Sequence, residues 1–279
     1  MDDEHRADAA RFGRRSFLAA AGLAAAAVVV SACGGDDSSA TGTSTTGGTG
    51  TSIPPTTPAT TPVTQATQTT QASGPAKFVS SGPTGTKQVA LTFHTDGDLG
   101  LAQQLLDALA AGKAKGTMFI VGSWLAANQS WAKHIQDAGH ELANHTYNHL
   151  SFETLSSQQK LDEIERCRDL LVQLTGTGGT FFRPSGTDDG VTSPSADTLD
   201  AAGTAEYRYV LGYDVDPLDY QNPGSDAVAS RVLDKVKAGS IVSLHFNHPG
   251  TIAALPTILS GLQQRGLEPV TASTLLAIP

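Results

Sequence analysis

The chain contains few cysteines and no extended run of basic residues. Cys33 and Cys167 are the only two cysteines among 279 residues. Acidic residues outnumber basic ones by 27 to 18, and no basic run follows residue 15, so the composition does not favour a nucleic-acid partner. Neither a G-x-G-x-x-G sequence nor a P-loop occurs where a nucleotide site would need one. The chemistry of this chain must therefore be sought in its other polar residues.

Large apolar side chains are almost absent from residues 34–76. This segment consists mainly of Gly, Ser, Thr, Pro and Gln. Such a segment cannot bury enough surface to offset the entropy lost on ordering. We therefore predict a disordered stalk over residues 34–76, followed by one domain over residues 77–279 that is long enough for a sizeable core.

The first 33 residues carry features of an export signal. Arg14-Arg15-Ser16-Phe17-Leu18 opens an alanine-rich apolar run that ends at Cys33, which resembles a twin-arginine signal followed by a lipoprotein cleavage box. The run is shorter than the roughly 18 residues of a comfortable membrane span. We predict export, lipidation at Cys33 and anchoring to the outer face of the cell membrane; the alternative is an uncleaved anchor helix. Cys167 then lacks a disulfide partner and is predicted to be a buried apolar side chain in a helix.

Segments with strand and helix patterns alternate along the expected domain. The expected strands cover 87–93, 117–121, 140–143, 179–183, 207–213, 240–246 and 267–270. The expected helices cover 101–111, 124–137, 156–176, 195–202, 226–238 and 252–265. About seven strands alternating with helices imply an α/β fold with a mostly parallel sheet, either a barrel or an open doubly wound sheet.

Polar clusters follow five of these strands, at the ends where such folds place their chemistry. The clusters cover residues 92–98, 144–149, 182–187, 213–220 and 243–248. In the second cluster His145 and His149 are four residues apart, and a helical turn or tight loop presents both imidazoles on one side, as a metal requires. Taken alone, this pair also fits a polar loop with two exposed histidines. Five clusters in succession are hard to assign to structure alone.

These motifs resemble those of the NodB-homology polysaccharide deacetylases over about residues 87–275. His145-Thr146-Tyr147-Asn148-His149 matches the family's metal-ligand motif, and Arg183-Pro184 matches the start of the next. Asp216-Pro217-Leu218-Asp219-Tyr220 matches the fourth motif with Tyr in place of Trp, and Leu244-His245 matches the fifth. The resemblance implies a distorted (β/α) barrel of about seven units. It also implies hydrolysis of acetyl groups from N-acetylated cell-wall or surface polysaccharide, such as peptidoglycan.

The resemblance further implies a divalent metal, zinc or cobalt, held by two histidines and one aspartate. His145 and His149 would be two of the ligands, and either Asp96 or Asp98 would be the third. The family has two adjacent aspartates before a glycine, the first a base and the second a ligand. Here His94-Thr95-Asp96-Gly97 has one residue more, and His94 or Thr95 occupies the base position. His94 could be the base, an additional ligand or part of the site wall.

The remaining roles are also implied by the family motifs. His245 would be the general acid, because the pKa of an imidazole lies near working pH. Asp216 would orient His245 or steady Arg183, and Arg183 would position the base. Side chains expected to contact substrate are Ser185, Tyr147 and Tyr220.

Two departures from the family motifs keep other readings open. The loop at His94 lacks the base aspartate, and Ser185-Gly186 replaces Pro-Tyr in the third motif. The alternatives are a glycan-binding pseudoenzyme and a hydrolase of a small amide or an O-acetyl ester. Because aromatic residues make up only 6% of the chain, a long platform for stacking sugars is not evident. We expect the protein to be a monomer.

Overall fold

A parallel sheet forms the centre of the domain in a computed structural model that describes residues 74–187 and 189–278. Over these residues the strand order is β1-β6-β5-β4-β3-β2-β7, with β8 beside β2. The strands are β1 Lys77–Val79, β2 Gln88–Thr95, β3 Thr117–Ile120, β4 Glu141–Asn144, β5 Phe181–Phe182, β6 Tyr209–Leu211, β7 Ile241–His245 and β8 Glu268–Val270. Because every pair is parallel, the carboxyl ends of the strands share one edge of the sheet.

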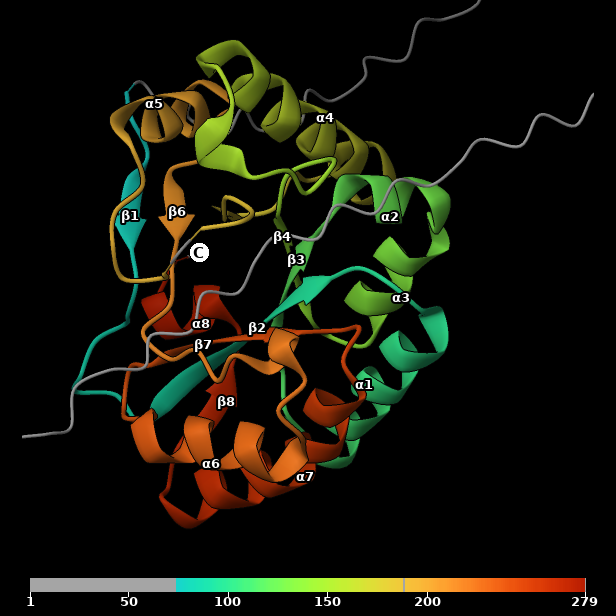
Figure 1. Cartoon of the computed structure of the whole chain (residues 1–279), viewed down its shortest axis with the longest axis vertical. Coiled ribbons are helices and arrows are strands. Elements are labelled where there is room, and N and C mark those ends of the chain that lie inside the picture. Colours follow the sequence, from blue (N-terminus) through green and yellow to red (C-terminus); the bar gives the residue numbers. More distant parts are fainter. Residues whose placement is uncertain (1–73, 188, 279) are drawn as a thin grey trace, which may run out of the picture. The chain divides into compact units, whose positions relative to one another are not determined.

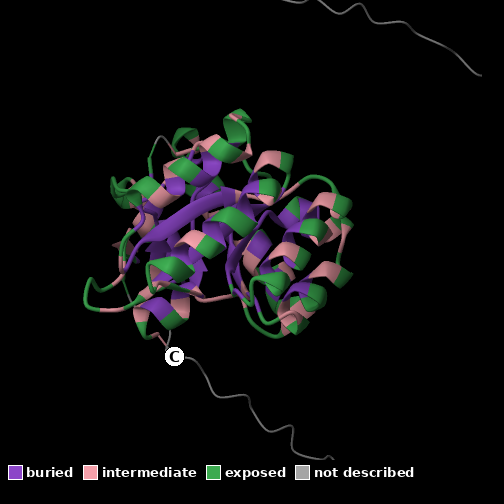
Figure 2. Ribbon diagram, turned by 90° about the horizontal axis from the view of Figure 1, so that it is seen from below, coloured by how far each residue is buried: buried purple, intermediate pink, exposed green. Residues whose placement is uncertain are grey.

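Helices surround this sheet (Figure 1). They are α1 Leu99–Ala111, α2 Gly122–Ala127, α3 Ser130–Asp137, α4 Ser157–Thr175, α5 Ala196–Thr204, α6 Ser225–Lys235, α7 Pro249–Gln264 and α8 Ala272–Leu276, with short 3₁₀ turns η1 Phe152–Thr154 and η2 Asp219–Gln221. Figure 2 shows buried strands inside helices whose outer faces are exposed. In β2, every residue from Val89 to Thr95 is buried, as expected for a strand that is covered on both faces.

The predicted alternation of strands and helices is confirmed, and α4 begins and ends as expected. Ser156 and Gln159 form the predicted capping box, and Gly176 ends the helix with a φ of 80°. The expected helix over 124–137 is instead two helices, α2 and α3. Asn128 interrupts it with a φ of −136°, and its side-chain amide donates to the carbonyl of Trp124 at 2.8 Å.

Strand β1 and helix α8 were not anticipated from the sequence. Strand β1 has only three residues, too short for a clear alternation of apolar and polar side chains. It pairs with β6 at one end of the strand order. Packing already begins at Ala76, whose N–H donates to the carbonyl of Leu199 at 2.9 Å.

Cys167 is fully buried in α4, as predicted, and is a free thiol. Burial raises the pKa of this thiol to about 12, so it carries no charge at neutral pH. The expected export signal, the lipidation site Cys33 and the stalk up to residue 73 lie outside the described residues and remain predictions. In the part of the chain that the structure describes, no helix has the length and apolar character needed to cross a membrane.

Candidate active site

Four histidines from three strand ends meet at the carboxyl edge of the sheet. His94 ends β2 beside β7, where its register partner is His245. The ring centroid of His94 lies 4.5 Å from that of His245 and 4.0 Å from that of His145. The ring centroids of His145 and His149 are 4.9 Å apart. Polar clusters that are separate in the sequence therefore form a single site.

The loop carrying His145 and His149 is a tight turn rather than a helix. Thr146 and His149 have φ values of 66° and 57°, in the left-handed region that few residues other than glycine adopt. Such a backbone persists only where its surroundings hold it in place. The side-chain oxygen of Asn144 accepts the Thr146 N–H at 2.9 Å, which fixes the start of the turn.

Glu163 holds the same turn from the side of α4. This buried carboxylate accepts hydrogen bonds from the N–H groups of Tyr147 at 3.0 Å and Asn148 at 2.7 Å, and from the Asn148 side chain at 2.5 Å. The guanidinium of Arg166 lies 3.8 Å from the centre of the Tyr147 ring. Sequence reasoning missed Glu163; the available signal was a charged residue beside the apolar positions of α4. Tyr147, predicted to contact substrate, helps fix the turn to this helix.

His145 has the features of a metal ligand. Its Nδ1 donates to the carbonyl of Arg183 at 2.8 Å, so the lone pair is on Nε2. That Nε2 is buried and has no hydrogen-bond partner among the described residues. Burial lowers the pKa of His145 well below its usual value and also lowers that of His149, which keeps both imidazoles in the neutral form that binds metal.

The two candidate aspartates are placed differently. Asp98 caps α1, and its Oδ1 accepts the N–H of Leu101 at 3.0 Å. Asp96 lies near enough to His149 for its charge to oppose the lowering of the His149 pKa by burial. Over residues 74–187 and 189–278, no group of three His, Cys, Asp or Glu side chains is arranged to hold a metal. The donor set therefore fits a metal in part: two imidazoles are in place, and Asp96 is the better placed carboxylate.

Arg183 lies beneath the histidines and is buried, with 2% exposure. It donates four hydrogen bonds: from Nε to Leu211 O at 2.8 Å, from Nη2 to Gly212 O at 3.0 Å, and from Nη1 to Thr92 Oγ1 at 2.9 Å and His94 Nε2 at 3.1 Å. None of these four acceptors is a carboxylate. Burial lowers the pKa of Arg183 to about 9, which still leaves it protonated at neutral pH. The guanidinium can only donate hydrogen bonds, so it positions His94 by donating to His94 Nε2.

The carboxylate that orients His245 is Asp219, not Asp216. His245 Nδ1 lies 2.7 Å from Asp219 Oδ1, and Asp219 Oδ2 accepts the His245 N–H at 2.9 Å and the Thr251 hydroxyl at 2.6 Å. Burial acts to raise the pKa of Asp219, but the bonds from His245 and Thr251 outweigh it and leave the pKa lowered. Asp216 instead accepts the N–H of Leu218 at 2.7 Å. Both aspartates lie in the same predicted motif.

The other side chains expected to contact substrate occupy different surroundings. Tyr220 is 46% exposed, and its ring centre lies 5.5 Å from that of His245. The hydroxyl of Ser185 is instead buried, 3.1 Å from the Thr146 hydroxyl and donating to Leu150 O at 2.5 Å. Ser185 therefore supports the histidine turn, in contrast to the predicted contact with substrate. Tyr220 retains a position from which it can contact a ligand.

A cavity of about 550 Å³ is lined in part by Arg183. Its wall includes Tyr213, Thr187, Glu153 and Ser195. Neither His145, His149 nor His245 lines it. The cavity is therefore a neighbour of the histidine site and shares Arg183 with it.

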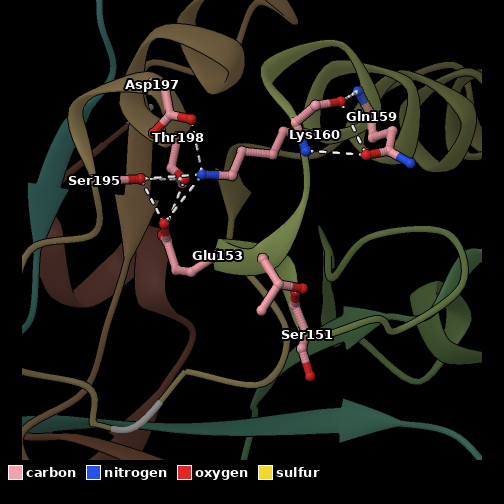
Figure 3. Close-up of polar contacts among 9 residues, drawn as sticks. Ser151, Glu153, Gln159, Lys160, Ser195, Asp197 and Thr198 are labelled. Carbon is pink, nitrogen blue, oxygen red and sulfur yellow. Dashed lines mark hydrogen bonds and ion pairs between the residues drawn. The ribbon is translucent and has the colours of Figure 1, made fainter.

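A buried lysine holds one wall of this cavity (Figure 3). Lys160 is 2% exposed, and its Nζ lies 3.1 Å from Glu153 Oε2, 3.0 Å from Asp197 Oδ2 and 3.1 Å from Ser195 Oγ. Thr198 completes the cluster by donating to Glu153 Oε1 at 2.9 Å. These contacts join α4, η1 and the start of α5. Since two carboxylates surround the ammonium, Lys160 acts as a cation within the cluster rather than as a base.

A parallel α/β fold with a histidine site at the carboxyl ends of its strands is typical of barrel enzymes, which place their chemistry at this edge. A family model described as polysaccharide deacetylase matches residues 81–210. The chain is also 34% identical over 200 residues to a peptidoglycan-N-acetylglucosamine deacetylase of Bacillus cereus, covering 70% of this chain and 90% of that protein. The chain belongs to the polysaccharide deacetylase family.

Solved structures agree with this assignment. A CE4 family pseudoenzyme from Bacillus anthracis matches with a TM-score of 0.66 at 27% identity, over 72% of this chain and 69% of that chain. The Bc1960 peptidoglycan N-acetylglucosamine deacetylase matches with a TM-score of 0.67 at 26% identity, over 72% and 94% of the two chains. These similarities confirm the predicted distorted (β/α) barrel.

Proposed function

We propose that this protein is a metal-dependent deacetylase that removes acetyl groups from the N-acetylated glycan of peptidoglycan. Family membership and the named activity of the Bacillus cereus relative support the reaction and the substrate class. The observation that carries the proposal is the free Nε2 lone pair of buried His145, whose Nδ1 is already committed to a backbone carbonyl. This arrangement is typical of a histidine that binds metal.

His145, His149 and Asp96 would hold the divalent ion, zinc or cobalt, with Asp98 retained as the helix cap. When bound, the ion would polarise the acetamide carbonyl and make the attacking water more acidic. His245 would exchange protons with the reacting groups, and Asp219 would stabilise its imidazolium form. Tyr220, exposed beside His245, would contact the sugar.

The proposed location follows from the N-terminal sequence. Export and lipidation at Cys33 would anchor the protein to the outer face of the membrane, and residues 34–76 would let the domain reach the wall. A peptidoglycan substrate is available in that location. We propose that the protein acts there as a monomer.

The test is release of acetate by the full-length protein. The protein is stripped with a chelator, reloaded with zinc or cobalt, and incubated with peptidoglycan and with N-acetylglucosamine oligomers. We expect acetate from the reloaded protein and none from the stripped protein. His145→Ala should bind no stoichiometric metal and release no acetate, whereas the exposed control His134→Ala should match the parent. Acetate from O-acetylated glycan alone would assign the protein to ester hydrolysis instead.

A further inference from the structure

Arg183, His94, His245 and Asp219 form one continuous chain of hydrogen bonds. Arg183 Nη1 lies 3.1 Å from His94 Nε2, His94 Nδ1 lies 2.9 Å from His245 Nε2, and His245 Nδ1 lies 2.7 Å from Asp219 Oδ1. A guanidinium is at one end and a carboxylate at the other. The first can only donate a hydrogen bond, and the ionised carboxylate can only accept one.

These two ends fix the position of every proton between them. Because Arg183 donates to His94 Nε2, that nitrogen carries a lone pair and the His94 proton lies on Nδ1. His94 Nδ1 therefore donates to His245 Nε2, which must carry a lone pair. The proton of His245 then lies on Nδ1, where Asp219 accepts it. In each of the three hydrogen bonds the donor lies on the Arg183 side and the acceptor on the Asp219 side. No other pair of neutral tautomers of His94 and His245 satisfies all three bonds.

This direction of the hydrogen bonds determines the role of His94, which stands in place of the base aspartate of the family. His94 has one nitrogen accepting from Arg183 and the other carrying a proton, so neither can take a proton from water. An aspartate at this position would behave in the opposite way, because it would accept from both Arg183 and His245. The exchange of aspartate for histidine thus reverses the hydrogen bond that reaches His245 Nε2.

We infer that His94 is a positioning residue that holds His245 as the Nδ1-protonated tautomer, and that His245 alone is first the proton acceptor and then the proton donor of the hydrolysis. The assignment of tautomers stands on the geometry, whereas its place in amide hydrolysis rests on the proposed function. In the first step water enters between His94 and His245, which separate from their 2.9 Å contact. His94 Nδ1–H donates to the water oxygen, and the water donates to His245 Nε2.

The proton is conserved through the two steps. As the water oxygen bonds to the acetamide carbon, one O–H bond breaks and its proton passes to His245 Nε2. Asp219 balances the charge of the imidazolium. When the carbon–nitrogen bond breaks, the same proton passes from Nε2 to the leaving amine. The products are the free amine and acetic acid, which releases its remaining hydroxyl proton to solvent as acetate, and His245 returns to its starting tautomer.

The tautomer is tested by ¹⁵N NMR of the full-length protein labelled on histidine, with the His245 signals assigned from a His245→Gln variant. We expect Nδ1 of His245 to be protonated and Nε2 to be unprotonated at neutral pH. His94→Asn keeps one acceptor for Arg183 and one donor for His245, so the His245 signals should stay as in the parent. His94→Asp offers acceptors only, so both nitrogens of His245 should become protonated. A parent protein with Nε2 protonated would overturn the inference.

Turnover separates positioning from base catalysis. Asparagine has no titratable nitrogen, so loss of a general base at position 94 would lower turnover of His94→Asn by about 10²–10⁴-fold. We expect His94→Asn to lose less than about tenfold and to retain more turnover than His94→Ala, which can make neither hydrogen bond. A loss as large in His94→Asn as in His94→Ala, with the His245 tautomer unchanged, would overturn the inference. If the parent releases no acetate, the proposed function fails while the nitrogen spectrum still decides the tautomer.

Discussion

Replacing Glu163 with glutamine should loosen the turn that carries His145 and His149. The buried carboxylate is the acceptor for three N–H donors of that turn, two from the backbone and one from the Asn148 side chain. Hydrogen bonds to charged groups contribute about 1.5–3 kcal/mol each, against about 0.5–1.5 kcal/mol for neutral ones. Glutamine removes the charge from all three, a loss of about 1–1.5 kcal/mol for each bond, so the free energy of unfolding should fall by about 3–4.5 kcal/mol.

The same substitution should weaken metal binding. Groups that orient metal ligands typically contribute about 10–100-fold to metal affinity. Stability is measured by urea unfolding of the metal-free protein, and affinity by competition with a chelator. The matched control is Glu165→Gln on the same helix, where the half-exposed carboxylate lies 3.6 Å from Arg168. That surface pair should contribute about 0–1 kcal/mol. Equal effects of the two substitutions on stability and on affinity would refute the assigned role of Glu163.

Two further substitutions address His245 and the cavity wall. Asp219→Asn should lower turnover by about 10²–10⁴-fold with metal content unchanged, since the His245 imidazolium loses its carboxylate; parent-like turnover would count against this role. Burial acts to raise the pKa of Glu153, but hydrogen bonds from Ser195 and Lys160 outweigh it and leave the pKa lowered. Hydrogen bonds from the same two residues lower the pKa of Asp197. Lowered carboxylate pKa values stabilise the fold above the unfolded pKa of about 4, and this stabilisation disappears as pH falls. The parent should therefore have a higher Tm than Lys160→Met at neutral pH, and this difference in Tm should shrink below about pH 5. A difference that stays constant with pH would contradict the assigned role of Lys160.

Much of the architecture could be predicted from the sequence because its signals are local. The strands that carry the site are continuous apolar runs, and α4 has a capping box at one end and a glycine at the other. Because carboxyl ends of parallel strands share an edge, His145, His149 and His245 could be expected to converge. The break at Asn128 and the three-residue strand β1 carry too little local pattern to be predicted.

The details of the site depend on contacts between distant segments, which the sequence does not show. Asp216 and Asp219 belong to the same short motif, and the sequence does not show that the backbone is left-handed at Leu218, before η2, or that Asp219 contacts His245. The direction of the hydrogen bond from His94 depends on Arg183, 89 residues away. The support that Glu163 gives to the histidine turn depends on how α4 packs against it. These contacts decide which residue acts and which one positions.

Acetate release is the most direct measurement of the central claim. The full-length protein, stripped and then reloaded with zinc or cobalt, is incubated with purified peptidoglycan, and free acetate is measured alongside the newly exposed amines. We predict equal amounts of acetate and amine from the reloaded protein and neither from the stripped protein or from His145→Ala. Absence of acetate with either metal, or equal release without metal, would contradict it.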